Sequence, residues 1–319
     1  MAYIPKPETN IEKPVLVIGA AGIDIVGHLQ GELTPGTSNP ANIRASYGGV
    51  ARNVAENLAR LGQPVKLLTV VGDDETGEQL LRSTANAGVD ISDVLRLSNH
   101  PTSTYLAVIG SRGNVEYAID DMRIINELSP SYFRDHLEAF LSASMLFVDA
   151  NLSREALRTV MSLARKVKIP VCADPASRPL TIKLKPYLNR LHLFTPNSFE
   201  AEILCGRSIT PSNRRQAIEA AKCLVSQGVD IAIIALGHFG VCYATTETSG
   251  RIPAIQTEVV DPTGAGDALT ATVIFALLNN IPLDDAIRLG VSAASLTLSH
   301  RGTVLPDLSV EKLYEHLVI

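Results

Sequence analysis

The residues from Asp261 to Asp267, DPTGAGD, combine a glycine-rich turn with two carboxylates and run directly into an apolar segment. The turn consists of Gly264, Ala265 and Gly266. At the start of a helix, such a turn points successive backbone N–H groups into one concavity, which can bind a phosphoryl group as its charge grows during transfer. Asp267 would lie in the first helical turn beside that concavity, where its carboxylate can accept the proton of an attacking hydroxyl. An ordinary acidic residue at a helix N-terminus is the alternative explanation.

A second candidate group lies in the run GGVARN, where Gly48 and Gly49 are followed by Asn53. Paired glycines let a substrate approach the backbone closely, and the Asn53 amide offers donors and an acceptor for vicinal hydroxyls. Asn57 comes four residues later and therefore shares a helix face with Asn53. A helix N-terminus with packing glycines and two solvated asparagines is the alternative.

A carboxylate also follows the first predicted strand, at Asp24. A carboxylate at the carboxyl end of a strand is well placed to bind sugar hydroxyls. A dinucleotide-binding fingerprint is the competing interpretation, but Gly19 and Gly22 are spaced G-x-x-G and no helical pattern follows them. This spacing argues against an oxidoreductase of the Rossmann type. A turn-forming aspartate is the other alternative.

Two further strand ends carry residues suited to metal and nucleotide binding. Asn197 and Glu200 could position Mg²⁺ through water, since this ion keeps much of its hydration shell. Gly237 and Gly240 could bring the backbone close to nucleotide phosphates. A Pro-Asn turn before a helical glutamate and a tight hairpin turn explain these two sites equally well. Walker A, protein-kinase and zinc-binding spacings are absent from the sequence, so phosphate binding would depend on backbone amides and Mg²⁺.

Short apolar runs rich in β-branched residues alternate with helical patterns along the chain. Near-continuous apolar strands are typical of a parallel sheet that is buried on both faces, so this alternation predicts an open α/β sheet covered by helices. Ser153 is expected to cap the helix that follows it. The predicted strands cover residues 15–19, 66–71, 145–149, 171–174, 191–195 and 231–236, and the predicted helices cover 49–61, 77–87, 153–167, 213–227 and 268–278.

Two stretches interrupt the alternation of strands and helices. Residues 28–47 are rich in Gly, Pro, Asn and Ser, and residues 102–109 and 114–119 alternate with period two around Ser111-Arg112-Gly113, which predicts a hairpin. We interpret the two stretches, about 28–47 and 102–122, as one small sheet that covers a site. Two long surface loops are the alternative. The expected organisation is a single domain over residues 1–319 with this lid.

Composition and charge exclude several classes of protein. The 319 residues are 46% hydrophobic, and 28 basic against 33 acidic side chains give a net charge of −5. The apolar content disfavours disorder, and the mild acidity disfavours a nucleic-acid partner. The most apolar run, 268–278, is shorter than the roughly 20 residues of a membrane span, and the N-terminus lacks the apolar segment of a signal peptide. Four widely spaced cysteines are typical of reduced thiols, so we expect a cytoplasmic protein. They are Cys172, Cys205, Cys223 and Cys242.

These motifs, in this order, resemble the ribokinase-like, or PfkB-type, family of sugar and nucleoside kinases. The similarity runs from about Val15 to Pro306. The stretch from Gly48 and Gly49 through Asn53 to Gly62 and Gly72 resembles the first family signature, and Asp261–Asp267 resembles the second. Within the family, the runs GGVARN, AIDDM and VDANLS are most similar to those of pseudouridine kinases, and Val50 replaces the lysine usual in ribokinases. The resemblance implies a three-layer α/β sandwich with a central, mostly parallel sheet and a small β-sheet lid.

The resemblance also implies a role for each candidate residue. Asp267 would be the general base, and the anion hole would be formed by Gly264, Ala265 and Gly266. The ribosyl hydroxyls would be held by Asp24, Gly48, Gly49, Asn53 and Asn151. The nucleotide would lie near Asn197, Gly237 and Gly240, with Glu200 holding Mg²⁺ through water. Asp261 and Thr263 match positions that help to bind a monovalent cation such as K⁺ in many relatives.

The expected activity is therefore ATP- and Mg²⁺-dependent phosphorylation of the 5′-hydroxyl of pseudouridine, giving pseudouridine 5′-phosphate and ADP. A kinase of another small sugar or nucleoside, such as ribose, fructose or adenosine, is the alternative within the family. A non-catalytic sugar- or nucleoside-binding relative is the alternative of another class, and the intact DPTGAGD run argues against it. The lid is also expected to pair subunits in a homodimer. Gly22 and Thr272 replace residues that are usual in the family.

Overall fold

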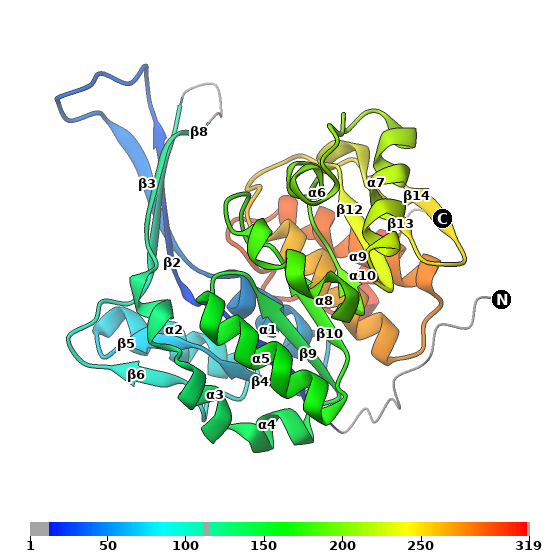
Figure 1. The fold of residues 1–319 in the computed structure, drawn as a ribbon. Helices are drawn as coiled ribbons and strands as arrows, with labels where there is room; N and C mark the ends of the chain where they lie inside the picture. The colour runs from blue at the N-terminus through cyan, green and yellow to red at the C-terminus, as the bar shows by residue number, and fades with distance from the viewer. Residues whose placement is uncertain (1–12, 111–114, 318–319) are drawn as a thin grey trace.

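The fold is built around one large β-sheet, which runs through the body of the molecule in Figure 1. The computed structural model describes residues 13–110 and 115–317. Within them the sheet has the strand order β14-β13-β12-β11-β10-β9-β1-β4, parallel from β4 to β12 and antiparallel at β13 and β14, as predicted for an open, mostly parallel sheet. The strands are β1 Val15–Ile18, β4 Val65–Leu68, β9 Met145–Asp149, β10 Val171–Asp174, β11 Leu193–Phe194, β12 Ile231–Ala235, β13 Val241–Ala244 and β14 Ser249–Ile252.

Helices cover both faces of this sheet and make three layers. Successive side chains of a strand point to opposite faces, so Leu16 and Ile18 of β1 enter one hydrophobic core while Val15 and Val17 enter another. The first core is closed by α3 Pro130–Asp135, α4 Leu137–Ser142, α5 Arg154–Val167, α6 Ser198–Cys205 and α7 Arg214–Ser226. The second is closed by α1 Val50–Arg60, α8 Ala265–Leu278 and α9 Leu283–Leu298, against which α10 Val310–His316 packs.

A separate small sheet rises from the body beside α1 in Figure 1. Its strand order is β3-β2-β7-β8, which excludes the alternative of two surface loops. It starts earlier than the predicted residue 28, because the chain enters β2 at Gly22 directly after β1. A side chain at Gly22 would collide with the carbonyl oxygen of Ser103, so this departure from the family pattern has a steric reason. The strands are β2 Gly22–Leu29, β3 Ala41–Gly48, β7 Thr104–Ile109 and β8 Val115–Asp121; the predicted turn at 111–113 lies outside the described residues.

The predicted strand 66–71 is wrong, because the chain changes sheets at Thr69. Residues before Thr69 form β4 in the large sheet, whereas β5 Val70–Gly72 pairs with β6 Leu95–Leu97 in a two-stranded sheet. The Thr69 hydroxyl donates to the carbonyl oxygen of Gly19 at 2.7 Å, and the backbone carbonyl of Thr69 accepts from Leu95 N–H. Helix α2 Glu75–Asn86 packs against β5 through Leu80 and Leu81. An apolar run alone does not show which neighbour a strand pairs with.

Most of the described α-helices have an N-terminus capped by a side chain, but α1, α4, α8 and α9 do not. The Ser153 hydroxyl accepts a hydrogen bond from Ala156 N–H, as predicted, and side chains also cap α2, α3, α6, α7 and α10. Glycines occupy the N-cap positions of α1 and α8, Gly49 and Gly264, without a side-chain cap. No helix of the described residues is long and apolar enough to span a bilayer. The remaining helical turns are 3₁₀ segments at Arg123–Glu127, Thr181–Lys183, Lys185–Arg190 and Gly237–Phe239.

One buried carboxylate ties the segments around the sheet's carboxyl edge together. Asp149, at the end of β9, accepts hydrogen bonds from the N–H groups of Ala20 at 2.8 Å, Ala51 at 3.2 Å and Asn151 at 2.9 Å. These groups belong to the β1–β2 junction, the first turn of α1 and the loop after β9. Because Gly19 has no side chain, the carboxylate can lie directly against its backbone. Asp149 thereby holds three segments that border the candidate site.

Candidate active site

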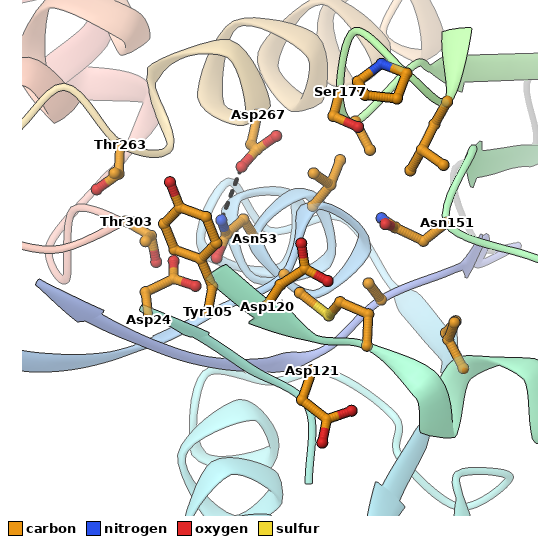
Figure 2. A pocket seen from close by; sticks show the side chains of 18 of the residues that line it. Asp24, Asn53, Tyr105, Asp120, Asp121, Asn151, Ser177, Thr263, Asp267 and Thr303 are labelled. Carbon is orange, nitrogen blue, oxygen red and sulfur yellow. Dashed lines mark hydrogen bonds between the residues drawn. The ribbon is translucent and has the colours of Figure 1, made fainter. Parts of the chain in front are cut away.

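Six of the nine residues predicted to bind the acceptor and the phosphoryl group border one pocket, shown in Figure 2, and Gly48, Ala265 and Gly266 are not among its lining residues. It has a volume of about 820 Å³ and lies between the small sheet and the carboxyl ends of β1, β9 and β10. Such a volume is within the range of about 300–1,000 Å³ that is usual for small-molecule sites. Of the predicted site residues, the pocket lining includes Asp24, Gly49, Asn53, Asn151, Thr263, Gly264 and Asp267.

The small sheet presents one row of polar side chains to this pocket. Asp24 of β2 pairs with Tyr105 of β7, which pairs with Asp120 of β8, so their side chains lie on one face of the sheet. All three line the pocket. Gly48 of β3 lies against the Asp24 carboxylate, where a side chain would collide with it. Asp24 follows the first strand of the large sheet, as predicted, and lies within β2 of the small sheet.

Asp267 and Asn53 form the central contact of the pocket. The Nδ2 group of Asn53 donates to Oδ2 of Asp267 at 2.7 Å, the dashed line in Figure 2. Burial raises the pKa of Asp267 to about 7, the Asn53 hydrogen bond opposes that rise, and the nearby charges of Asp149 and Asp24 add to it. The predicted alternative of solvated asparagines is wrong, because both Asn53 and Asn57 are buried in α1.

Other carboxylates around the pocket also have pKa values raised above their usual range. Burial raises the pKa of Asp24 to about 6, with Arg52 opposing the shift and Asp261 contributing to it. Asp174, at the end of β10, has a pKa well above its usual range because of burial and the charges of Glu200 and Asp267. Acids collected in this way leave the pocket ready to receive cationic charge, or a metal-bound phosphate, from solution.

The N-terminus of α8 supplies unpaired backbone donors next to Asp267. The first N–H groups of a helix have no partner within it, and Gly264 provides no side chain to cap them. Gly264 has a φ of 78°, and a side chain there would collide with the backbone of Thr303. A side chain at Gly266 would point into open space, so the backbone is accessible there. Together with the helix dipole, these amides can bind an anion.

The residues predicted to bind Mg²⁺ and the nucleotide lie outside the pocket lining. Asn197 and Glu200 form a capping box on α6, in which Asn197 Oδ1 accepts from Glu200 N–H at 3.0 Å and Glu200 Oε2 accepts from Asn197 N–H at 2.8 Å. Gly237 and Gly240 border the short turn between the antiparallel strands β12 and β13, which matches the hairpin alternative. Gly237 faces open space, whereas Gly240 packs against Ile252. Each position therefore has a structural role in the described structure.

Asp261 links the loop before α8 to the loop after α9. Its Oδ1 accepts from Thr263 N–H at 3.0 Å and from the Thr263 hydroxyl at 2.5 Å, and its Oδ2 accepts from Gly302 N–H at 3.2 Å. A carboxylate has about four acceptor positions, so these contacts leave capacity for a cation.

Several pocket residues were not among the predicted site residues. Lys183 donates from Nζ to the carbonyl oxygens of Ala150 at 3.1 Å and Leu152 at 2.9 Å, and so holds the loop that carries Asn151. Thr303, Tyr105 and Asp120 line the pocket as well. Asp120 lies in the run AIDDM, and the period-two pattern of its hairpin could have assigned it to one face. Lys183 has no local sequence signal, because its role depends on a distant loop.

The comparisons with known proteins agree with this geometry. A model of the pfkB family carbohydrate kinases matches residues 12–309. The chain belongs to the pfkB family. Its members named as pseudouridine kinase or ribokinase are phosphotransferases with an alcohol acceptor, and this PfkB-family protein is an enzyme of that class.

Relatives of this PfkB-family kinase differ in their named substrates. It is 35% identical to the pseudouridine kinase of Escherichia coli K12 over 93% of this chain and 94% of that protein. It is 28% identical to a guanosine-inosine kinase of Exiguobacterium acetylicum over 92% of this chain and 97% of that protein. The structure of Arabidopsis thaliana ribokinase complexed with ribose and ATP matches this fold with a TM-score of 0.83 at 22% identity. The match covers 96% of this chain and 99% of that chain. The structure of a putative ribokinase II from E. coli in complex with ATP and Mg²⁺ matches with a TM-score of 0.81 at 19% identity. The match covers 95% of this chain and 98% of that chain. These likenesses confirm the ribokinase-like fold.

The raised pKa of Asp267 predicts an acid limb in the activity profile. Only the ionised carboxylate can accept a proton, so kcat/KM for the acceptor at saturating ATP should rise with pH at a slope of about one and level off above about pH 7. Below about pH 6 the slope should steepen as Asp24 also becomes protonated. Steady-state rates between pH 5 and 9 measure this limb, and a flat profile between pH 5.5 and 8 would contradict it.

Proposed function

We propose that this protein is an ATP-dependent kinase that transfers the γ-phosphoryl group of ATP to the 5′-hydroxyl of pseudouridine. The observation that carries the proposal is the position of Asp267 beside the uncapped N-terminus of α8, at one end of a pocket of about 820 Å³. The 35% identity to a pseudouridine kinase over nearly the whole chain supports the choice of acceptor.

The proposed reaction needs one base and one anion site. Asp267 accepts the proton of the 5′-hydroxyl while the hydroxyl oxygen forms a bond to the γ-phosphorus and the bond to the ADP oxygen breaks. The amides of Gly264, Ala265 and Gly266 stabilise the charge on the transferring group. Asp24, Gly49, Asn53 and Asn151 line the pocket where they can position the ribosyl hydroxyls, with Gly48 keeping the backbone close. Closure of the small sheet would exclude water that hydrolyses ATP.

ATP is the expected donor because ribokinase-like kinases bind it. Mg²⁺ would be held by the nucleotide phosphates and, through water, by Glu200, whose Oε1 is outside the capping box. The ion supplies positive charge that offsets the negative charge of the phosphates. Asn197, Gly237 and Gly240 would border the nucleotide, since Gly237 is open to solvent. Asp261 and Thr263 fit a K⁺ ion through their free oxygen positions.

The uracil ring of pseudouridine carries one hydrogen-bond donor that the ring of uridine lacks, and the pocket can recognise it. Pseudouridine joins ribose to uracil through C5, and therefore carries an N1–H donor where uridine carries a C5–H. The Asp120 carboxylate points into the pocket (Figure 2) and forms no hydrogen bond or salt bridge within the described residues. Its neighbour Asp121 points away in Figure 2 and is paired with Arg123 at 2.7 Å. We infer that Asp120 accepts the N1–H of the bound base.

An acceptor panel with MgATP tests both the substrate and this contact. We expect kcat/KM for pseudouridine to exceed that for uridine, ribose, fructose and adenosine. Because a hydrogen bond to a charged group contributes about 1.5–3 kcal/mol, Asp120→Ala should lower kcat/KM for pseudouridine about 10- to 100-fold and leave that for uridine nearly unchanged. Asp121→Ala should keep the preference of the wild type.

The two parts of this prediction fail separately. A free sugar turned over far better than pseudouridine would contradict the substrate, and would favour the alternative of another sugar or nucleoside kinase in the family. Equal losses for pseudouridine and uridine in Asp120→Ala would contradict the contact alone. Binding of acceptors without turnover would favour a non-catalytic relative.

We also propose that two copies of the chain pair through their small sheets. The face opposite the pocket carries two apolar rows: Tyr117, Val108, Gly27 and Ile43, and Ile119, Leu106, Ile25 and Ala45. Tyr117 is 59% exposed, Ile119 65% and Ile43 71%. A contiguous exposed apolar face of this kind marks a protein interface, and a second copy offers the same face in return.

Charging this face should dissociate the dimer. Tyr117→Asp is expected to shift the sedimentation coefficient from that of a dimer to that of a monomer at micromolar concentration, because a carboxylate would be buried without a partner. Leu141→Lys, a charge placed at an exposed apolar residue of α4, is the matched control and should remain dimeric. A wild-type protein that sediments as a monomer at every concentration would contradict the proposal.

A further inference from the structure

Arg52 is a buried cation one residue before Asn53, and it lies outside the pocket lining. It is 3% exposed, although an arginine inside a protein needs partners for its donors. Its Nε donates to the Thr84 hydroxyl at 3.2 Å and its Nη2 pairs with the Glu56 carboxylate. Its Nη1 donates at 2.9 Å both to the carbonyl oxygen of Tyr47 and to Oδ1 of Asn53.

The contact with Arg52 determines which end of the Asn53 amide faces Asp267. A guanidinium has donors and no acceptor, so only the carbonyl oxygen of the amide can face it. The NH₂ group must then point the other way, where it donates to Asp267 Oδ2 at 2.7 Å. With the amide reversed, its oxygen would face the Asp267 carboxylate, and two acceptors can share a hydrogen bond only if Asp267 is protonated. Arg52 therefore selects the amide orientation that stabilises the ionised acid.

Asp267 needs this help because most of the charges around it are negative. The negative charges of Asp149 in β9 and Asp24 in β2 raise the pKa of Asp267, whereas the positive charge of Arg52 in α1 lowers it. Asp267 in turn raises the pKa of Asp174 in β10. The arginine is itself fixed by Glu56, which Arg60 also contacts through Nε at 3.0 Å. Few alternative positions are open to a guanidinium held by so many partners at once.

We propose that Arg52 is a positioning residue that acts through the Asn53 amide to keep Asp267 ionised at neutral pH. The inference rests on the proposed function, because it assumes that Asp267 is the base. The same guanidinium holds the carbonyl of Tyr47 at the end of β3, to which the Thr303 hydroxyl also donates at 2.6 Å. The root of the small sheet and the orientation of the base are thus joined by one side chain.

The test is the pH profile of kcat/KM for the best acceptor at saturating MgATP. A lysine cannot reproduce the planar fork of Arg52, so Arg52→Lys should shift the acid limb upward by about 0.5 to 1 pH unit. At pH 7, close to the wild-type pKa of about 7, its kcat/KM should fall about two- to fivefold, and most of this loss should disappear at pH 9. Arg52→Met should shift the limb at least as far; if it does not fold, Arg52→Lys alone decides the test.

Glu56→Gln is the matched control, because it disturbs the same buried network but keeps the Arg52–Asn53 hydrogen bond. Its acid limb should stay at the wild-type position or move to lower pH, whatever its thermal stability. A loss of activity in Arg52→Lys that is equal at pH 7 and pH 9, or a limb shifted equally in Glu56→Gln, would overturn the inference and leave Arg52 with a structural role only. A wild type that phosphorylates no acceptor would instead contradict the proposed function.

Discussion

The site depends on keeping one carboxylate both buried and ionised. In the proposed reaction, burial concentrates the electrostatic effect of Asp267 at the acceptor hydroxyl. Burial and, to a smaller extent, the charges of the neighbouring acids together raise the pKa of Asp267 to about 7. The structure opposes this cost with the Asn53 amide, the Arg52 guanidinium and the N-terminus of α8. The same helix end that favours a negative charge on Asp267 also offers amides to a phosphate. In the proposed mechanism, the base and the anion site therefore both depend on the electrostatic field at the N-terminus of α8.

The fold places these groups by ending several strands and helices at one edge of a parallel sheet. Asp149 fixes the junctions around that edge through backbone hydrogen bonds, and the pairing of β2, β7 and β8 aligns Asp24, Tyr105 and Asp120 on the facing sheet. The pocket thus lies between the carboxyl edge of the large sheet and the separate small sheet. That division suits an enzyme whose acceptor must enter before water is excluded.

Much of the fold and the centre of the site could be predicted from the sequence. The parallel sheet, the small sheet and the helix start at DPTGAGD follow from local patterns, and Asp267 lies in the first turn of α8 as expected, while its role as base stays a prediction. The split at Thr69 and the place of Asp24 in β2 could not be predicted, because strand pairing is decided by distant partners. The roles of Arg52 and Lys183 depend on contacts across the fold, and Thr272, buried with no hydrogen bond to its hydroxyl among the described residues, shows no compensating partner.

The rate of the chemical step in Asp267→Asn tests the central claim most directly. Rapid-quench measurement of phosphoryl transfer from ATP to pseudouridine separates chemistry from product release, and a parallel titration gives the affinity for ATP. If Asp267 is the general base, the rate should fall about 10²- to 10⁴-fold, with the affinity for ATP unchanged. A variant that transfers the phosphoryl group at nearly the wild-type rate would contradict the account.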